Sequence, residues 1–155
     1  MRPLFVGLAS LLLLGAFQHP GSSPQGRLST TSFRALMERL ATAWNSGDAA
    51  AGAACFTEDA VYGSPPSPRV RKGRRALFEF FGGERGRPRP MKMQWHHLLF
   101  DEERQIGAGE YTFQYDIRTH GVVMVQLVNS RIARWREYEV ESPLDWETLA
   151  GETRF

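Results

Sequence analysis

Residues 105–140, QIGAGEYTFQYDIRTHGVVMVQLVNSRIARWREYEV, decide the fold. Their β-branched and aromatic residues predict three strands, Gln105–Ile117, Val122–Val128 and Arg131–Val140. Thr119-His120-Gly121 is typical of a turn between the first two strands, and Asn129-Ser130 suits a two-residue hairpin between the last two. The stretch therefore predicts an antiparallel meander.

Helical patterns dominate the chain before this meander. Four helices are predicted: Ser32–Asn45, Ala49–Phe56, one that opens at Gly73-Arg74-Arg75 and ends at Gly82-Gly83, and a short last helix over Leu144–Ala150. Met91–Phe100 adds a strand. Helices first and an antiparallel meander second indicate the α+β class. Gly107 and Gly109 permit a bulge or sharp bend in their strand. We therefore expect a cone-shaped, strongly bent antiparallel sheet, with helices packed on its concave face around a pocket.

Residues 1–26 differ from the rest of the chain and are typical of a signal peptide with a linker. Arg2 precedes an uncharged apolar run, Leu4–Phe17, and the breaker-rich segment His19–Pro24 follows it. The run is shorter than the roughly 20 residues that span a bilayer. We therefore expect an exported protein, periplasmic or extracellular, with one domain over residues 27–155 and no stable membrane insertion after signal removal. The alternative is a mis-assigned start codon ahead of a cytoplasmic protein.

The composition argues against several classes of protein. Hydrophobic residues make up 42% of the chain, which is enough for a core. The 19 basic and 17 acidic residues nearly balance, so charge gives no argument for a nucleic-acid partner. The basic residues between Arg69 and Lys92 fit a solvated loop surface, or a pocket mouth that attracts an anion. The single cysteine, Cys55, excludes a disulfide within the chain and suits a buried structural thiol.

Motifs for metals and cofactors are missing from the sequence. No spaced set of His, Cys and acidic residues argues for a metal. His96 and His97 are adjacent on a predicted strand, where neighbours face opposite sides, so they are not expected to share one ion. The glycines of Gly82–Gly86 lack the preceding strand and the following lysine of a phosphate-binding loop. We expect chemistry or binding that needs no cofactor.

Four segments carry a resemblance to a known family: Trp44–Asp48 (WNSGD), Cys55–Tyr62 (CFTEDAVY), Gly73–Leu77 (GRRAL) and Arg131–Tyr138 (RIARWREY). Together they resemble a SnoaL-like domain of the nuclear transport factor 2-like superfamily, and the likeness covers about Phe33–Val140. The resemblance implies the bent-sheet fold. It also implies a homodimer through the outer face of the sheet, where Val122–Val128 is hydrophobic. It does not imply one activity, because the fold hosts cyclases, isomerases, epoxide hydrolases, dehydratases and binding modules.

Two enzyme branches of this superfamily can be compared with the chain. The positions resembling the tyrosine, the general-base aspartate and the second acid of ketosteroid isomerases carry Leu40, Ser64 and about Met124. These substitutions disfavour that chemistry. Limonene epoxide hydrolases fit better, since the resemblance places their acids at Glu137 and near Glu110, and their tyrosine at Tyr62. Their asparagine falls on Ser64, and their bridging arginine falls on about Ala108 and is absent.

Glu110 and Glu137 are the leading catalytic candidates, with Tyr62 as a donor to a ligand oxygen. If both acids face an apolar pocket, their pKa values are pushed apart, so that one serves as acid and the other as base. The alternatives are that each acid faces solvent or pairs with an arginine, and that Tyr62 is an aromatic wedge. The candidate ligand-binding residues are Trp44, Trp95, His97 and Trp135.

The sequence as a whole predicts an exported protein that binds a small, largely apolar molecule. Acid–base chemistry of a hydrolase, isomerase or cyclase type, without metal or cofactor, is the predicted activity. The alternative is a non-catalytic ligand-binding or dimerisation module.

Overall fold

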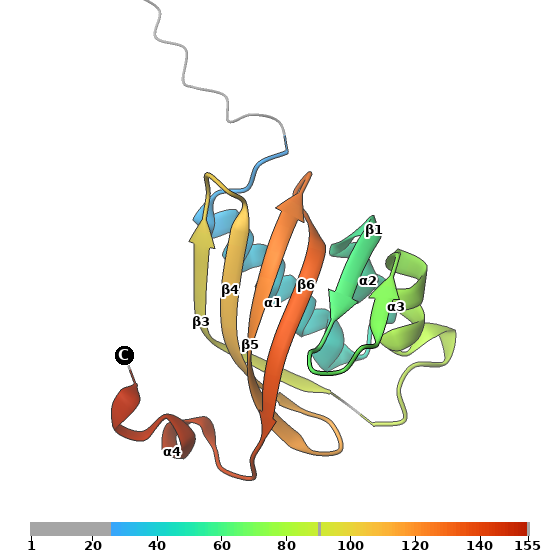
Figure 1. The fold of residues 1–155 in the computed structure, drawn as a ribbon. Coiled ribbons are helices and arrows are strands. Elements are labelled where there is room, and N and C mark those ends of the chain that lie inside the picture. The colour runs from blue at the N-terminus through green and yellow to red at the C-terminus, as the bar shows by residue number, and fades with distance from the viewer. Residues whose placement is uncertain (1–25, 90, 155) are drawn as a thin grey trace, which may run out of the picture.

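The computed structural model describes residues 26–89 and 91–154. One curved sheet has the strand order β2-β1-β6-β5-β4-β3 (Figure 1). Its strands are β1 (Phe56–Gly63), β2 (Val70–Lys72), β3 (Lys92–Asp101), β4 (Ile106–Gln114), β5 (Arg118–Val128) and β6 (Arg131–Glu141). The helices are α1 (Thr30–Ser46), α2 (Ala49–Ala54), α3 (Arg74–Phe80) and α4 (Trp146–Ala150), with short 3-10 turns η1 (Gly83–Arg85) and η2 (Gly151–Thr153). These elements confirm the predicted α+β class. The predicted signal segment lies outside the described residues.

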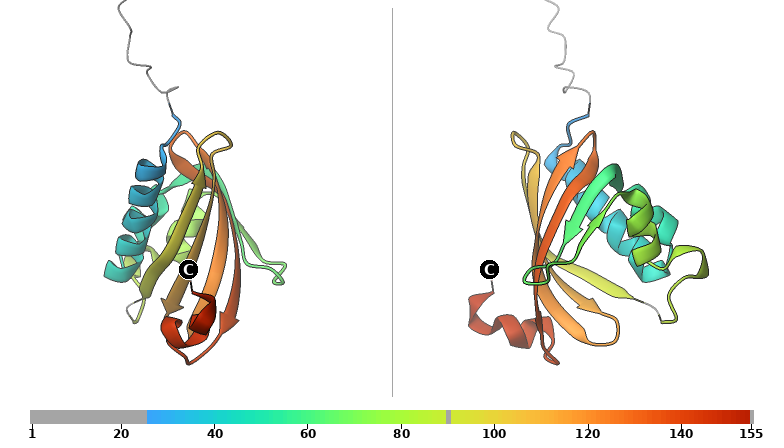
Figure 2. Two further views of the ribbon diagram at one scale, coloured as in Figure 1. Left: turned by 90° about the vertical axis from the view of Figure 1, so that its left-hand side faces the viewer. Right: turned by 45° about the vertical axis from the view of Figure 1, so that its right-hand side comes forward.

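Helices α1, α2 and α3 lie on one side of the sheet, which curves around them (Figure 2). The core fills the space between these layers, and Phe33, Leu36 and Met37 of α1 are almost fully buried in it. The inward side chains Val123, Val125 and Leu127 of β5 alternate with exposed neighbours, as expected for a strand with one covered face. In the part of the chain that the structure describes, no helix is long and apolar enough to cross a membrane.

Helix α1 follows the predicted apolar face and begins two residues earlier than expected. The Ser29 hydroxyl accepts a hydrogen bond from the Ser32 backbone N–H, which caps the first turn. Gly47 ends the helix in the left-handed conformation, with φ of 73°, which glycine adopts without steric cost. The last turn of α1 thereby places Trp44 beside α2 and the sheet.

Gly107 and Gly109 serve close packing in β4. A Cβ atom at residue 107 would lie 2.4 Å from Cζ of Phe33, and one at residue 109 would lie 2.6 Å from Cζ3 of Trp95. These glycines therefore let two aromatic rings approach the strand backbone. The register shift expected near them occurs instead in the neighbouring strand β3, between Trp95 and His97.

Three features of the sheet differ from the sequence prediction. β1 pairs in parallel with β6, so the sheet is not entirely antiparallel. The three-residue strand β2 is too short to give a clear sequence pattern. Thr119, His120 and Gly121 lie inside β5 and do not form a turn, because the chain reverses at residues 115–117. His120 is buried there, and its Nε2 lies 3.0 Å from the Leu144 carbonyl oxygen, so its polar ring is satisfied within the fold.

Candidate functional site

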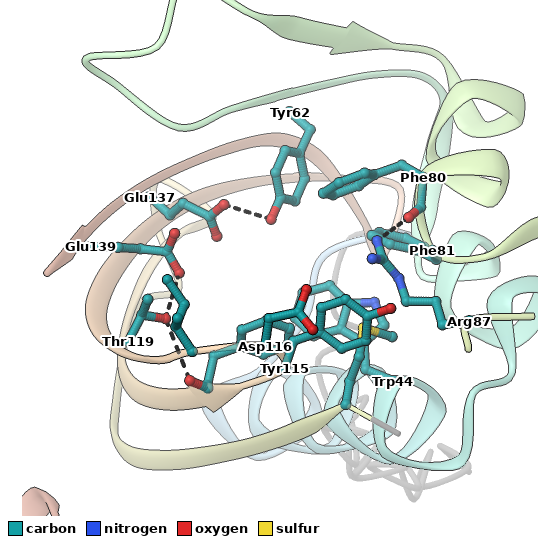
Figure 3. Close-up of a pocket in the computed structure, with 13 residues that line it drawn as sticks. Trp44, Tyr62, Phe80, Phe81, Arg87, Tyr115, Asp116, Thr119, Glu137 and Glu139 are labelled. Atoms are coloured by element: carbon teal, nitrogen blue, oxygen red, sulfur yellow. Dashed lines mark hydrogen bonds between the residues drawn. The ribbon is translucent and has the colours of Figure 1, made fainter. Parts of the chain in front are cut away.

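A pocket of about 370 Å³ lies between the ends of α1 and α3 and the concave face of the sheet (Figure 3). Six aromatic residues line it: Trp44, Tyr62, Phe80, Phe81, Phe113 and Tyr115. Two carboxylates, Glu137 and Glu139, face it from β6. An apolar enclosure with a few convergent polar groups is the usual form of a small-molecule site.

Glu137 is the polar centre of this pocket and is only 7% exposed. The Tyr62 hydroxyl donates to Oε1 at 2.7 Å, and the Trp135 indole N–H donates to Oε2 at 2.7 Å. The Tyr111 hydroxyl lies 3.2 Å from the same Oε2. These contacts fix the orientation of the carboxyl group. Because a carboxylate oxygen has two lone pairs, Oε1 keeps one that can accept a hydrogen bond from a ligand.

The parallel pairing of β1 with β6 builds this constellation. Tyr62 lies opposite Trp135 in the register, and their rings stack with centroids 5.4 Å apart and 8° between planes. Trp135 and Glu137 are two residues apart on β6, so their side chains point to the same face. The structure therefore brings the sequence-predicted residues Tyr62, Trp135 and Glu137 together.

The environment of Glu137 raises the pKa of its carboxyl group toward neutral pH. Burial raises the pKa of Glu137 to about 7, and the charge of Glu139 adds to this rise, while hydrogen bonds from Tyr62, Trp135 and Tyr111 oppose it. A carboxyl group with such a pKa can both accept and release a proton near pH 7. Burial and the charge of Glu137 raise the pKa of Tyr62 well above its usual value, so its hydroxyl remains a donor.

Glu139 is a second pocket carboxylate that the sequence analysis does not identify. Its Oε1 accepts from the Thr119 hydroxyl at 3.1 Å and lies 3.1 Å from the Tyr111 hydroxyl. Tyr111 therefore stands between the two carboxylates. The period-two alternation of β6, which places Trp135, Glu137 and Glu139 on one face, is the sequence signal that could have identified it.

Glu110 does not face the pocket. Its neighbours on β4, Gly109 and Tyr111, are buried on the concave side, so Glu110 points to the outer face. Its Oε2 lies 2.7 Å from Nδ1 of His97, and the two side chains are 28% and 32% exposed. The prediction that both strand acids face one pocket is therefore wrong for Glu110, and His97 also lies outside the pocket.

The bulge in β3 changes the placement of the two adjacent histidines. The register shifts between Trp95 and His97, and Nε2 of His96 lies 2.8 Å from Oγ1 of Thr112. Thr112 and Glu110 alternate on β4 and share the outer face, so both histidines face outward. The expectation that they face opposite sides is wrong. Within residues 26–89 and 91–154, no group of three or more His, Cys, Asp or Glu side chains could hold a metal ion.

Trp44 and Trp95, both predicted to bind ligand, have different positions relative to the pocket. Trp44 lines the pocket directly. Trp95 packs edge-on against Tyr111, with ring centroids 5.6 Å apart, and its indole N–H donates to the Met37 carbonyl oxygen at 3.0 Å. Trp95 thus supports Tyr111 and does not line the pocket. Four further aromatic residues of the pocket wall were not predicted from the sequence: Phe80, Phe81, Phe113 and Tyr115.

Comparison with known proteins identifies the family of this domain. The SnoaL-like domain family matches residues 37–135. A protein of unknown function with a cystatin-like fold from Methylobium petroleophilum PM1 is similar at 20% identity, covers 83% of this chain and 85% of its own, and has a TM-score of 0.64. An LEH-like epoxide hydrolase of M. tuberculosis is similar at 18% identity. The match covers 71% of this chain and 84% of that enzyme, with a TM-score of 0.61.

A third similar structure is that of SalBIII, an epoxide hydrolase/cyclase-like enzyme with a role in pyran ring formation in the polyether salinomycin. It shares 20% identity, 71% of this chain and 92% of that chain are covered, and the TM-score is 0.60. No curated protein matches the sequence. Likeness to these structures supports the fold, and the family match extends over more than half of the chain. The chain belongs to the SnoaL-like domain family.

Proposed function

We propose that this chain is an exported protein that binds a small, largely apolar molecule in the aromatic pocket, and that Glu137 transfers a proton to or from that molecule. The observation that carries the proposal is the buried Glu137 carboxyl, which three neutral donors hold at the pocket wall. The reaction would be of the hydrolase, isomerase or cyclase type and would need no cofactor. The apolar run Leu4–Phe17 supports the export part of the proposal.

The chemistry follows from the orientation of the carboxyl group. Oε1 carries the remaining lone pair, so it would accept a proton from a ligand carbon or from an attacking water. The protonated carboxyl would then return that proton to an oxygen of the ligand. Tyr62 remains neutral and holds Oε1 in place throughout. The names of the M. tuberculosis and salinomycin enzymes favour an epoxide, or a molecule that closes to a pyran ring, as the substrate.

Replacement of Glu137 by glutamine tests the proposed role. For any epoxide or polyketide-like ketone that the native chain converts, we expect Glu137→Gln to lower kcat by about 100-fold or more. One general acid–base group typically contributes at least this factor to the rate. Glu110→Gln is the matched control, since Glu110 lies on the outer face. Its kcat should match that of the native chain. Full activity of Glu137→Gln would overturn the proposal.

A second candidate function is non-catalytic ligand binding. The observation that favours it is the position of Glu110, because the pocket lacks the second acid that the epoxide hydrolase resemblance placed there. The position matching the bridging arginine is Ala108, which pairs with the outward-facing Met124. A ligand that co-purifies unchanged and is identified by mass spectrometry, together with no turnover of epoxides or polyketide-like ketones, would support this alternative.

We also propose that the chain forms a homodimer through the outer face of the sheet. Val122, Tyr138 and Val140 expose 43%, 50% and 56% of their surface on this face, where a partner could cover them. Val122→Lys should shift the native dimer to a monomer in light scattering, since a charge would be buried in the interface. Val70→Lys, at an exposed valine of β2, should leave the dimer intact. A monomeric native chain at high concentration would contradict the proposal.

A further inference from the structure

On the basis of the proposed function, we infer that the ligand of this pocket carries a positively charged nitrogen, which lies against Glu137 and Glu139 and the surrounding aromatic rings. The ligand would occupy the aromatic pocket described above and belong to the class of organic cations. A protonated aliphatic amine is the simplest member of that class.

The first observation is a pair of carboxylates that lack a counter-charge. Glu137 is more than nine-tenths buried and faces the pocket together with Glu139. Among residues 26–89 and 91–154, their hydrogen bonds come from hydroxyl groups and an indole N–H. In the described part of the chain, every ion pair lies elsewhere, and none includes either of these acids. A buried carboxyl group such as Glu137 is normally paired with a cation or holds a proton, whereas Glu139 is the exposed member of the pair.

The second observation is the aromatic wall around these carboxylates. Tyr62 and Trp44 contribute rings from β1 and α1 (Figure 3). Phe113 contributes one from β4. Aromatic faces attract organic cations through their negative π-electron density. An enclosure of rings with carboxylates at one side therefore favours an ammonium group over a neutral or anionic group of the same shape.

The other charged residues of the pocket are Arg87, whose buried Nε has no hydrogen-bond partner among the described residues, and Asp116. Arg87 donates to the Phe80 carbonyl oxygen, and its guanidinium lies over the rings of Phe80 and Tyr115, at 5.3 and 5.0 Å from their centroids. Asp116 pairs with Arg89 at 2.7 Å. Figure 3 shows Arg87 across the pocket from Glu137. The negative charge that lacks a cationic partner therefore lies on the Glu137 side, across the pocket from Arg87.

Proton linkage gives this inference a pH signature. Burial and Glu139 raise the pKa of Glu137 to about 7, so Glu137 must lose its proton to face a cation. The groups that face Glu137 are Tyr62 on β1, Tyr111 on β4, and Trp135 and Glu139 on β6. For an amine that stays protonated throughout, affinity should rise about tenfold from pH 6 to pH 8 as the ionised fraction of Glu137 increases.

Three probes of one shape test the inference: cyclohexylmethylamine, cyclohexylmethanol and cyclohexanecarboxylate. Binding is followed by NMR through the indole N–H signals of the full chain. At pH 8 we expect the amine to bind at least tenfold more tightly than the alcohol, and the carboxylate to bind most weakly. Alcohol or carboxylate binding as tight as amine binding would overturn the inference and leave the proposed function standing. Failure of all three probes to bind would count against both, because the pocket would then not accept a small apolar body.

Two variants separate the charge effect from damage to the fold. Glu139→Gln removes the more exposed carboxylate and should reduce amine affinity several-fold while alcohol affinity stays the same. Glu152→Gln, at an exposed acid in η2, makes the same change in net charge and should leave amine affinity unaltered. Equal amine binding by the native chain and Glu139→Gln would contradict the role of the carboxylate pair.

Discussion

Glu137→Gln is expected to gain stability over the native chain as the pH rises, although it loses activity. The free-energy gap between the two proteins should widen in favour of the variant by about 3 kcal/mol between pH 4 and pH 8. Urea unfolding at these two pH values measures the gap. A protein that becomes more stable when a catalytic residue is replaced shows the trade-off between stability and activity that is typical of active sites.

The sign of this effect follows from proton binding. The pKa of Glu137 is raised to about 7 in the folded protein, from 4.5 in an unperturbed glutamate. Between these values the folded chain holds a proton that the unfolded chain has released. Stability of the native chain therefore falls as the pH rises through this window, and no further loss from this group occurs above it. Glutamine cannot ionise, so the variant lacks this loss.

Glu152→Gln controls for the change in net charge, because Glu152 is exposed in η2. Its free-energy gap to the native chain should stay nearly constant from pH 4 to pH 8. If the gap for Glu137→Gln is equally constant, Glu137 does not take up a proton in the folded protein near neutral pH. The acid–base role would then lose its physical basis.

Trp135→Ala should lower the free energy of unfolding by about 3–5 kcal/mol, the usual cost of truncating a buried tryptophan. Trp135 is 2% exposed and stacks on Tyr62. It also packs near Trp44 and Phe56, with ring centroids at 5.7 and 6.0 Å. Truncation would leave a cavity beside the pocket and remove the indole N–H that orients Glu137. Chemical denaturation monitored by circular dichroism measures the loss.

Trp135→Phe separates the packing role from the hydrogen bond. It keeps most of the ring volume and removes only the donor to Oε2 of Glu137. We expect a smaller loss of stability than in Trp135→Ala, together with weaker ligand binding or turnover. Equal stability of Trp135→Ala and the native chain would mean that this ring does not hold the pocket together.

The resemblance to the epoxide hydrolases predicts the main acid of the site, Glu137, and the alternating pattern of β6 agrees with it. That pattern places Glu137 and Trp135 on the covered face, and the resemblance adds Tyr62. It does not reveal that Tyr62 reaches Glu137 through a parallel pairing of β1 with β6, since strand pairing depends on contacts far apart in the chain. Glu139 follows the same alternation and could have been identified from it.

Glu110 shows why the other predicted site residues could not be placed correctly from the sequence alone. A shift of one residue moves a strand side chain to the opposite face. Gly109 carries no side chain that would mark the inward face of β4, and the bulge at His96 disturbs the pattern of β3. The faces of Glu110 and His97 therefore depend on packing against Trp95 and Tyr111, which only the folded structure reveals.

The central claim is that Glu137 is a buried carboxyl poised to exchange a proton with a pocket ligand. A ¹³C NMR titration of its side-chain carboxyl, assigned by the signal that disappears in Glu137→Gln, tests this claim most directly. The expected midpoint lies near pH 7, as the burial of the group and the nearby charge of Glu139 require. A midpoint at or below the 4.5 of an unperturbed glutamate would contradict it.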